Sequence, residues 1–555
     1  MDPNRNARWS RCIAEELRRG GAGLAVLCPG SRNSPLLFPL AHVFGTDAVS
    51  HIDERSAGFL ALGFIRASGR PAVVCVTSGS AVANLLPALV EAHADRLPLI
   101  VVTADRPWEA IGCGAPQALR QEGLLTPAVV REVFLGEPSD DDLTLRALRR
   151  ETSRLVQTAG PTHLNVPLRD PLPPLEDPAW TPAPVSDLAL RGRADGAPFT
   201  QITTHLSGGR VTLPPWWTPG LRGLIAVGPG APAEGLADLA RASGFPVLAD
   251  AASGLRHDGT PHLVTLADSL VGSDLGQEPF DLAVLIGSQP TARATYEFLA
   301  KRARRVITLG AQPLDPHAHA DWTCEAPGAV AAVAAAVPGP GDTPWRDRWL
   351  SAEAAGRARL AQAVAGLPWG EAAAIHAAAN AVGFRFLLLA SSMAVRHANL
   401  LLGAGASRPV LANRGVNGID GTLGTFLGAS RHLGPGVALV GDLAFLHDLP
   451  ALAAAGGSGA IVVLNNGGGA IFDYLPVARV PGYERWIRTA HDRRLAPAAE
   501  LFGLVLHEVR DRAGLDAALA QARDGRLHLI EGAVHGLDAV GEHRRLLRVV
   551  RGEKV

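Results

Sequence analysis

Two apolar runs in the last third of the chain end in residues that suit a metal ion and a phosphate. Residues 437–440 lead into Gly-Asp at 441–442, and residues 461–464 lead into Asn-Asn-Gly-Gly-Gly at 465–469. A carboxylate, an amide oxygen and glycine-exposed carbonyls are the hard oxygen ligands that Mg²⁺ prefers, and a diphosphate would complete the octahedron. Glycines also let backbone N–H groups approach phosphate oxygens. Taken alone, the same residues are equally typical of two ordinary turns.

A candidate acid lies in the first third of the chain. The stretch HIDERSAGFLALGF at 51–64 places Glu54 at the start of an apolar helix. An acid in a first helical turn is usually a solvated residue that favours the helix dipole. On its own this position therefore predicts either a helix start or a catalytic carboxyl group.

Polar residues, most of them arginines, follow several other predicted strands or turns. Arginine presents a planar fork to a carboxylate, so a cluster of them would fit a substrate with several acid groups. Since only two of the 52 basic residues are lysines, most arginines must simply be solvated. The candidates at strand or turn ends are Ser31, Arg32, Arg106, Arg293, Arg396 and Arg414.

A rival motif lies in the middle of the chain. GPGAPAEG at 228–235 follows an apolar run and opens a predicted helix, and Asp250 lies about 20 residues further on, as in a dinucleotide-binding fingerprint. Pro229 and Pro232, however, remove donors from the loop that would bind the pyrophosphate. An NAD- or FAD-dependent oxidoreductase and a plain structural domain both stay open here.

The elements that must position these residues are short apolar strands that alternate with Ala- and Leu-rich helices. Such strands are typical of parallel sheets covered on both faces. Pro-rich stretches at 168–220 and 338–346 are typical of linkers. We therefore predict an α/β protein of three doubly wound, mainly parallel domains at 1–185, 190–345 and 350–555. Ligands of such sheets bind at the carboxyl ends of the strands.

Composition excludes several classes of protein. The 555 residues are 47% hydrophobic with a net charge of −1, which favours a globular chain without a nucleic-acid partner. The two lysines, Lys301 and Lys554, lie outside any P-loop, pyridoxal or kinase context. Five scattered cysteines and a charged N-terminus favour a reducing cytoplasm, and no apolar run is long enough to insert into a membrane.

The motifs together resemble the thiamine diphosphate-dependent enzymes, which have pyrimidine, central Rossmann-like and pyrophosphate domains. More narrowly, CPGSRNSPL, DERSAGFLALGFIRASGRP, NRGVNGIDGTLGT, GDLAFLHDLPAL and NNGGGAIFDYLP are similar to the 2-succinyl-5-enolpyruvyl-6-hydroxy-3-cyclohexene-1-carboxylate synthases of menaquinone (vitamin K2) biosynthesis. The similarity covers essentially the whole chain. Leu443 departs from the general pattern by replacing a glycine, and Arg293 replaces a lysine.

This resemblance implies a role for each matching position. Glu54 matches the glutamate that hydrogen-bonds the aminopyrimidine of the cofactor, and the other catalytic positions are Ser31, Arg32 and Gln117. Asp442, Asn466 and the carbonyl of Gly468 match the ligands of Mg²⁺ or Mn²⁺. The remaining cofactor contacts are Ile419, Gly441, Leu443 and Ile471. The substrate-facing positions are Arg106, Arg293, Ser392, Arg396, Arg414, Phe472 and Leu475.

The resemblance also implies the reaction: a transferase that decarboxylates 2-oxoglutarate and adds the succinyl unit to isochorismate. Arg396 and Arg414 would hold the distal carboxylate of 2-oxoglutarate. A homodimer is implied, in which Glu54 of one subunit and Asp442 of another reach one cofactor; pairing of dimers into tetramers stays open. The alternatives are another thiamine diphosphate-dependent 2-oxo acid decarboxylase or carboligase, a cofactor-binding protein without activity, and the oxidoreductase above.

Overall fold

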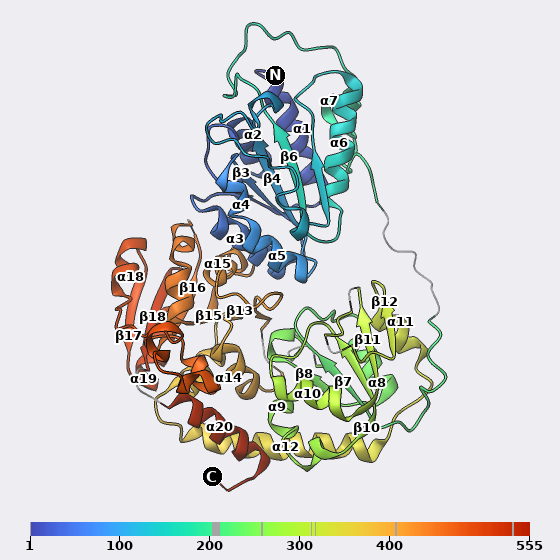
Figure 1. Ribbon diagram of the computed structural model, residues 1–555, viewed down its shortest axis with the longest axis vertical. Coiled ribbons are helices and arrows are strands. Elements are labelled where there is room, and N and C mark those ends of the chain that lie inside the picture. The colour runs from blue at the N-terminus through green and yellow to red at the C-terminus, as the bar shows by residue number, and fades with distance from the viewer. Residues whose placement is uncertain are drawn as a thin grey trace. The chain divides into compact units, whose positions relative to one another are not determined.

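The computed structural model describes residues 2–202, 211–256, 259–311, 313–316, 318–405, 408–454, 456–534 and 538–554. Its described strands form three six-stranded sheets, and every neighbouring pair is parallel. Helices cover the sheets, as Figure 1 shows. The predicted α/β fold of three parallel sheets is confirmed. No helix among these residues is long and apolar enough to cross a membrane.

The first sheet has the strand order β2-β1-β3-β4-β6-β5. Its strands are β1 (Leu24–Leu27), β2 (Ala48–Ser50), β3 (Ala72–Val76), β4 (Leu99–Asp105), β5 (Arg131–Phe134) and β6 (Thr162–Pro167). The accompanying helices are α1 (Arg5–Arg19), α2 (Ser34–Phe44), α3 (Glu54–Ser68), α4 (Ser80–Ala83), α5 (Leu86–Ala94), α6 (Asp142–Val156) and α7 (Asp187–Arg191). Two apolar clusters form the core, one on each face of the sheet. The central strands are buried throughout because both faces are covered.

Helix α3 begins at Glu54 for a local reason. The Asp53 side chain accepts a hydrogen bond from the Ser56 amide (3.1 Å) and so caps the first turn. The apolar residues that follow bury the helix against the sheet. A second helix, α15 (Thr422–Leu433), packs on α3, and a Cβ added to Gly63 would lie 2.0 Å from the Thr425 carbonyl oxygen. Only glycine allows this approach of the two backbones.

The second sheet has the order β12-β11-β10-β7-β8-β9, the classic doubly wound order of a Rossmann fold. Its strands are β7 (Gly223–Val227), β8 (Val247–Ala249), β9 (Leu263–Val264), β10 (Phe280–Ile286), β11 (Ala303–Gly310) and β12 (Trp322–Glu325). The helices are α8 (Leu236–Ser243), α9 (Ala267–Leu270), α10 (Arg293–Arg302) and α11 (Ala329–Ala336), followed by the long α12 (Thr343–Ala365). An apolar cluster from β7, β10, α8 and α11 fills one face.

The third sheet, β14-β13-β15-β16-β18-β17, repeats the strand order of the first. Its strands are β13 (Phe386–Leu389), β14 (Val410–Leu411), β15 (Gly436–Gly441), β16 (Gly459–Asn465), β17 (Val505–Val509) and β18 (Leu527–Ala533). The helices are α13 (Glu371–Ala379), α14 (Met393–Leu401), α16 (Asp442–His447), α17 (Tyr483–Trp486), α18 (Ala496–Phe502), α19 (Arg512–Gln521) and α20 (Ala539–Arg551). Because connections leave β13 and β15 in opposite directions, a crevice is expected between their carboxyl ends.

The chain divides into two compact units. Unit 1 comprises residues 1–204, 415–434 and 446–457, and unit 2 comprises 205–414, 435–445 and 458–555. Unit 1 contains the first sheet together with α15, and unit 2 contains the other two sheets. Within unit 2, α12 lies against α20, so that the helix after the Pro-rich stretch at 338–346 packs on the C-terminal helix. The predicted domain boundaries themselves stay predictions.

Candidate active site

Asp442 lies at the carboxyl end of β15 and is only 2% exposed. Its Oδ2 accepts hydrogen bonds from the amides of Gly467 (2.8 Å) and Gly468 (2.9 Å), while its Oδ1 accepts one from the Leu443 amide (2.7 Å). The glycine loop after β16 is therefore tied to the end of β15. The two sequence motifs meet at one edge of the third sheet, and the loop amides bind the carboxylate.

Asn466 presents an unused oxygen at this edge. Its Nδ2 donates to Glu371 Oε1 (2.7 Å), whereas its Oδ1 is buried and has no hydrogen-bond partner among the described residues. A buried carbonyl oxygen without a donor is costly unless a ligand satisfies it. The carboxylate of Asp442 and the amide oxygen of Asn466 thus have the chemistry of a hard-cation site.

Gly468 has a conformation that side chains rarely adopt. Its φ is +139°, and a Cβ there would lie 2.6 Å from the Arg488 carbonyl oxygen. Gly441 has open space instead, since an added Cβ would meet no described atom within 4 Å. The part of the chain that the structure describes contains no group of three or more His, Cys, Asp or Glu residues that could hold a metal ion. Amide and backbone oxygens would have to supply part of any metal shell here.

Three predicted substrate residues lie together at the ends of β13 and β14. Ser392 immediately precedes α14, and Arg396 on that helix donates to the Ser392 carbonyl oxygen (2.7 Å). Arg414 follows β14 and donates to Ser391 Oγ (3.5 Å). Burial lowers the pKa of Arg396, while Asp268 and Asp250 oppose that shift, and the guanidinium stays a cation. This cationic group occupies the same sheet edge as Asp442.

Helix α14 is anchored from the second sheet. Arg256 is fully buried and donates to the carbonyl oxygens of Asn399 (2.8 Å) and Leu402 (2.7 Å) and to Asn399 Oδ1 (2.7 Å). Asn399 in turn donates to Asp268. Burial lowers the pKa of Arg256 to about 10. These bonds fix the helix that carries Ser392 and Arg396.

In unit 1, Glu54 is half-buried at the start of α3. Its Oε2 accepts a hydrogen bond from Asn84 Nδ2 (3.2 Å). Ile419, the predicted apolar contact of the cofactor, belongs to the same unit and is 42% exposed. Both side chains are therefore open to a ligand or to another chain.

The other predicted residues of unit 1 form a polar edge. Arg32 donates to the Leu168 carbonyl oxygen (2.8 Å) and Arg106 to that of Pro116 (3.0 Å). Each Nε is buried and lacks a partner within the described ranges. Burial lowers the pKa of Arg32, and Arg106 adds to that shift, so the two cations lie close enough to repel each other. Ser31 and Gln117 are exposed.

Four further predicted residues of unit 2 lie just after the glycine loop or at the start of α10. Ile471 and Phe472 are half-buried on the 3-10 helix that follows the glycine loop, and Leu475 ends it with 50% exposure. Arg293 begins α10; its side chain is 88% exposed and pairs with Glu297 (2.6 Å). A role of Arg293 in substrate binding stays a prediction.

The rival dinucleotide motif has structural roles. Asp250 is buried and accepts hydrogen bonds from the amides of Ala252 (2.8 Å) and Thr291 (2.6 Å), so its carboxylate is already engaged. A Cβ on Gly228 would lie 1.7 Å from the Ser288 carbonyl oxygen. That glycine is needed for loop packing, and these contacts argue against a ribose-binding acid at position 250.

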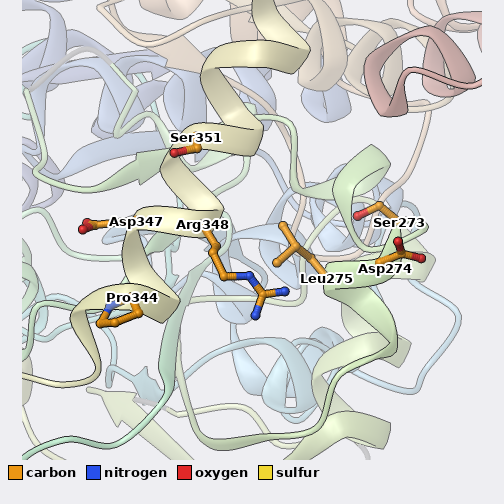
Figure 2. A pocket seen from close by; sticks show the side chains of 7 residues that line it. All are labelled: Ser273, Asp274, Leu275, Pro344, Asp347, Arg348 and Ser351. Carbon is orange, nitrogen blue, oxygen red and sulfur yellow. The ribbon is translucent and has the colours of Figure 1, made fainter.

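Two hollows lie in unit 2. Figure 2 shows one of about 490 Å³ in which Arg348 reaches from α12 towards Leu275. It lies beside the segment that enters β10, the amino end of that strand, and Arg348 pairs with Glu278. A smaller hollow of about 280 Å³ is lined by Asn466 and Glu371. Because ligands of parallel sheets bind at the carboxyl ends, the smaller hollow is the relevant one.

Sequence reasoning missed two residues at the Asp442 edge. His491 places its Nε2 3.3 Å from Asp442 Oδ2, and its backbone amide donates to the Gly467 carbonyl oxygen (3.0 Å). Glu371 contacts Asn466 from α13, and burial raises the pKa of Glu371 while the Asn466 hydrogen bond opposes this. Neither residue belongs to a sequence motif, because each lies far along the chain from the glycine loop that it contacts.

Comparison with known proteins agrees with this geometry. Residues 8–124 match the family described as thiamine pyrophosphate enzyme, N-terminal TPP binding domain. A 2-succinyl-5-enolpyruvyl-6-hydroxy-3-cyclohexene-1-carboxylate synthase of Myxococcus xanthus is 37% identical, with 98% of this chain and 97% of the relative covered. Synthases of the same name from Halobacterium salinarum (36%; 99% and 98% covered) and Chloroflexus aurantiacus (34%; 98% and 96%) are also similar.

The parallel sheets, the glycine loop tied to the end of β15 and the matched N-terminal domain define a thiamine diphosphate-dependent enzyme. The cofactor predicted from the sequence is confirmed at this level. The full-length similarity is more specific: the chain belongs to the family of 2-succinyl-5-enolpyruvyl-6-hydroxy-3-cyclohexene-1-carboxylate synthases. The individual site residues stay predictions.

Proposed function

We propose that this protein is a transferase that decarboxylates 2-oxoglutarate and adds the succinyl unit to the ring of isochorismate, releasing CO₂ in menaquinone biosynthesis. The observation that carries the proposal is the sheet edge shared by Asp442, Asn466, Arg396 and Arg414, which combines ligands for a metal diphosphate with cations for an acidic substrate. Membership of the synthase family selects the two substrates.

We infer that Asp442, the amide oxygen of Asn466 and the carbonyl of Gly468 hold Mg²⁺ or Mn²⁺. The unpartnered Asn466 oxygen supports this assignment. When bound, thiamine diphosphate supplies the electron sink for decarboxylation. Gly468 permits the close approach of its loop to the Arg488 carbonyl oxygen, and the backbone at Gly441 faces open space.

The chain's own residues would orient the substrates and move a proton. Arg396 and Arg414 can pair with the distal carboxylate of 2-oxoglutarate, because each presents a permanent cation at the end of β13 or β14. Arg32 and Arg106 each keep an unused N–H donor, which suits the carboxylates of isochorismate. Glu54 would exchange a proton with the aminopyrimidine and so assist the deprotonation that starts the reaction.

We further propose a homodimer, in which the Glu54 side of one subunit and the Asp442 side of another bind one cofactor. The exposed apolar residue Ile52, two positions before Glu54, and the exposed Val416 and Ile419 of the same unit support an interface on unit 1. We place the enzyme in the cytoplasm, because its five cysteines are all unpaired in the structure.

The test is 2-oxoglutarate consumption and product mass with thiamine diphosphate and Mg²⁺, with and without isochorismate. Consumption that needs isochorismate, with a product of the adduct's mass less CO₂, is the expected result. Decarboxylation at the same rate without isochorismate would identify a simple 2-oxo acid decarboxylase instead. Absence of turnover in both reactions would contradict the proposed activity.

A further inference from the structure

We propose that Glu371 is a positioning residue that holds the Asn466 side chain with its oxygen, and not its NH₂ group, directed at the metal ion. This inference rests on the proposed function, because it assigns to Asn466 the metal ligand role given above. Glu371 begins α13 and belongs to no sequence motif, so the inference adds a new residue to the candidate metal site of the third sheet.

The contact between the two side chains is buried and exclusive. Glu371 is 3% exposed, and its Oε1 lies 2.7 Å from Asn466 Nδ2. Among the described residues, this amide is the only hydrogen-bond donor to the Glu371 carboxylate. The second oxygen, Oε2, lies 3.9 Å from Nε2 of the fully buried His397. A buried carboxylate with one donor holds that donor firmly.

The orientation matters because the two ends of an asparagine amide are alike in shape and opposite in hydrogen bonding. One end is an acceptor that can bind a cation, and the other carries two donors that repel one. A flip of the Asn466 amide would place Oδ1 against the Glu371 carboxylate and its NH₂ group at the metal. Glu371 therefore makes the metal-binding orientation the favourable one.

The preceding residue provides a comparison within the same loop. Asn465 also donates to a buried glutamate, with Nδ2 2.7 Å from Glu531 Oε1. Its own Oδ1, however, accepts a hydrogen bond from the Gly467 amide (3.2 Å) and is used inside the fold. Of the two asparagines, only Asn466 keeps an oxygen for a ligand.

A competing explanation is that Glu371 only stabilises the start of α13. It is the first residue of that helix, where an acid favours the helix dipole. Glu542 provides a matched control, because its Oε2 accepts from the Ala372 amide (3.4 Å) at the same helix end without contacting Asn466 in the described structure. The helix explanation predicts that both glutamates affect stability and neither affects metal binding.

The experiment titrates Mn²⁺ into metal-free enzyme at saturating thiamine diphosphate, with free Mn²⁺ followed by its EPR signal. We expect Glu371→Leu to weaken Mn²⁺ binding about 10–100-fold, the usual effect of losing the partner of a metal ligand. Glu371→Gln, which can still accept from Asn466, should bind within a few-fold of wild type. Glu542→Leu should bind like wild type. Equal affinities for Glu371→Leu and Glu542→Leu would overturn the inference.

A second variant pair keeps the test valid if Glu371→Leu does not fold. Asn466→Asp offers only acceptor oxygens but places a carboxylate against Glu371, so its Mn²⁺ affinity should fall. Adding Glu371→Gln removes the repulsion, and the double variant should bind Mn²⁺ more tightly than Asn466→Asp alone. A double variant no tighter than the single one would contradict the role of Glu371. Wild-type enzyme that binds no Mn²⁺ would instead refute the proposed metal site, and the inference with it.

Discussion

Glu54 shows how the role of one residue depends on where the chain places it. The sequence positions it in a first helical turn, and in the structure it is half-buried and accepts a hydrogen bond from Asn84. A carboxyl group in this setting can meet a ligand directly. Because we propose that Glu54 exchanges a proton with the cofactor, its replacement should lower turnover but leave cofactor binding nearly unchanged.

Glu54→Gln should lower kcat by about 10²–10⁴-fold, the usual contribution of a general acid or base. Thiamine diphosphate binding should change little, because glutamine can still accept from Asn84 and still fills the same space. Steady-state kinetics and calorimetric titration of the cofactor measure the two quantities. Near-normal turnover with bound cofactor would show that Glu54 does not move a proton.

We expect different arginines to bind the two substrates. Arg396→Gln should raise the KM for 2-oxoglutarate by about 10–100-fold, as expected for the loss of a charged hydrogen bond of about 1.5–3 kcal/mol. Arg106→Gln should raise the KM for isochorismate by a similar factor.

The sequence also predicts that Arg293 contacts the substrate, but its exposed side chain pairs with Glu297. An unchanged KM for isochorismate in Arg293→Gln would count against that contact. Both KM values must be measured for each variant.

At the scale of elements, the pairing of α3 and α15 rests on glycines at the contact. A Cβ at Gly428 would lie 1.9 Å from the Leu60 carbonyl oxygen, and Gly63 has a similar contact with Thr425. The helices approach at the backbone, so a methyl group cannot be accommodated by a rotamer change. Since Glu54 begins α3, this packing also fixes the start of the helix that carries the predicted acid.

Gly428→Ala should therefore lower the free energy of unfolding by about 1–3 kcal/mol, a typical cost of overpacking. Gly366→Ala is the matched control, because an added Cβ there meets no described atom within 4 Å and its φ of −105° suits any residue. It should stay within about 0.5 kcal/mol of wild type. Urea denaturation measures both values, and equal stabilities would refute the close approach of the helices.

At the scale of the whole molecule, unit 2 joins its two sheets through a buried polar cluster. Arg256 bridges β8 and α14, and Asp268 accepts from Asn399 and from Thr295 (2.8 Å). Buried charges of this kind require each partner in place, because a lone charge in the interior is costly. The second sheet thus acts on the candidate site through α14.

Asp268 predicts a pH dependence of stability. Burial raises its pKa from 3.8 to about 6, with a further contribution from Asp250. The folded protein binds this proton more tightly than the unfolded chain, so the contribution is complete below about pH 4 and is lost as the pH rises through about 6. Over that pH range, the free energy of unfolding of wild type should fall by up to about 3 kcal/mol more than that of Asp268→Asn. Urea denaturation across pH, with the exposed Asp274→Asn as control, checks this; parallel curves would contradict it.

The proposed dimer predicts complementation between two inactive variants. If one cofactor contacts Glu54 of one subunit and Asp442 of another, then co-expressed Glu54→Gln and Asp442→Asn chains form mixed dimers with one intact site. Random pairing should restore about a quarter of the wild-type specific activity. Purified preparations of each variant alone provide the baseline. Mixed dimers without activity would show that both residues act from the same chain.

The sequence by itself determined the strands, the fold class and the family. The apolar runs that precede Asp442 and Asn465 are β15 and β16, because local composition decides strands and turns. The proposed roles of Arg396 and Arg414 rest on matching motifs and stay predictions. These features depend on residues close together in the chain or on blocks shared with relatives.

Only the tertiary structure decided which distant residues meet. Glu371 and His491 reach Asn466 and Asp442 from separate segments, and Asp250 turned out to cap a loop instead of facing a ribose. The order of strands in the third sheet brings these segments to one edge, and periodicity along the chain carries no record of that order. Contacts between residues far apart in sequence depend on how the sheets and helices pack, and so they could not be read from local patterns.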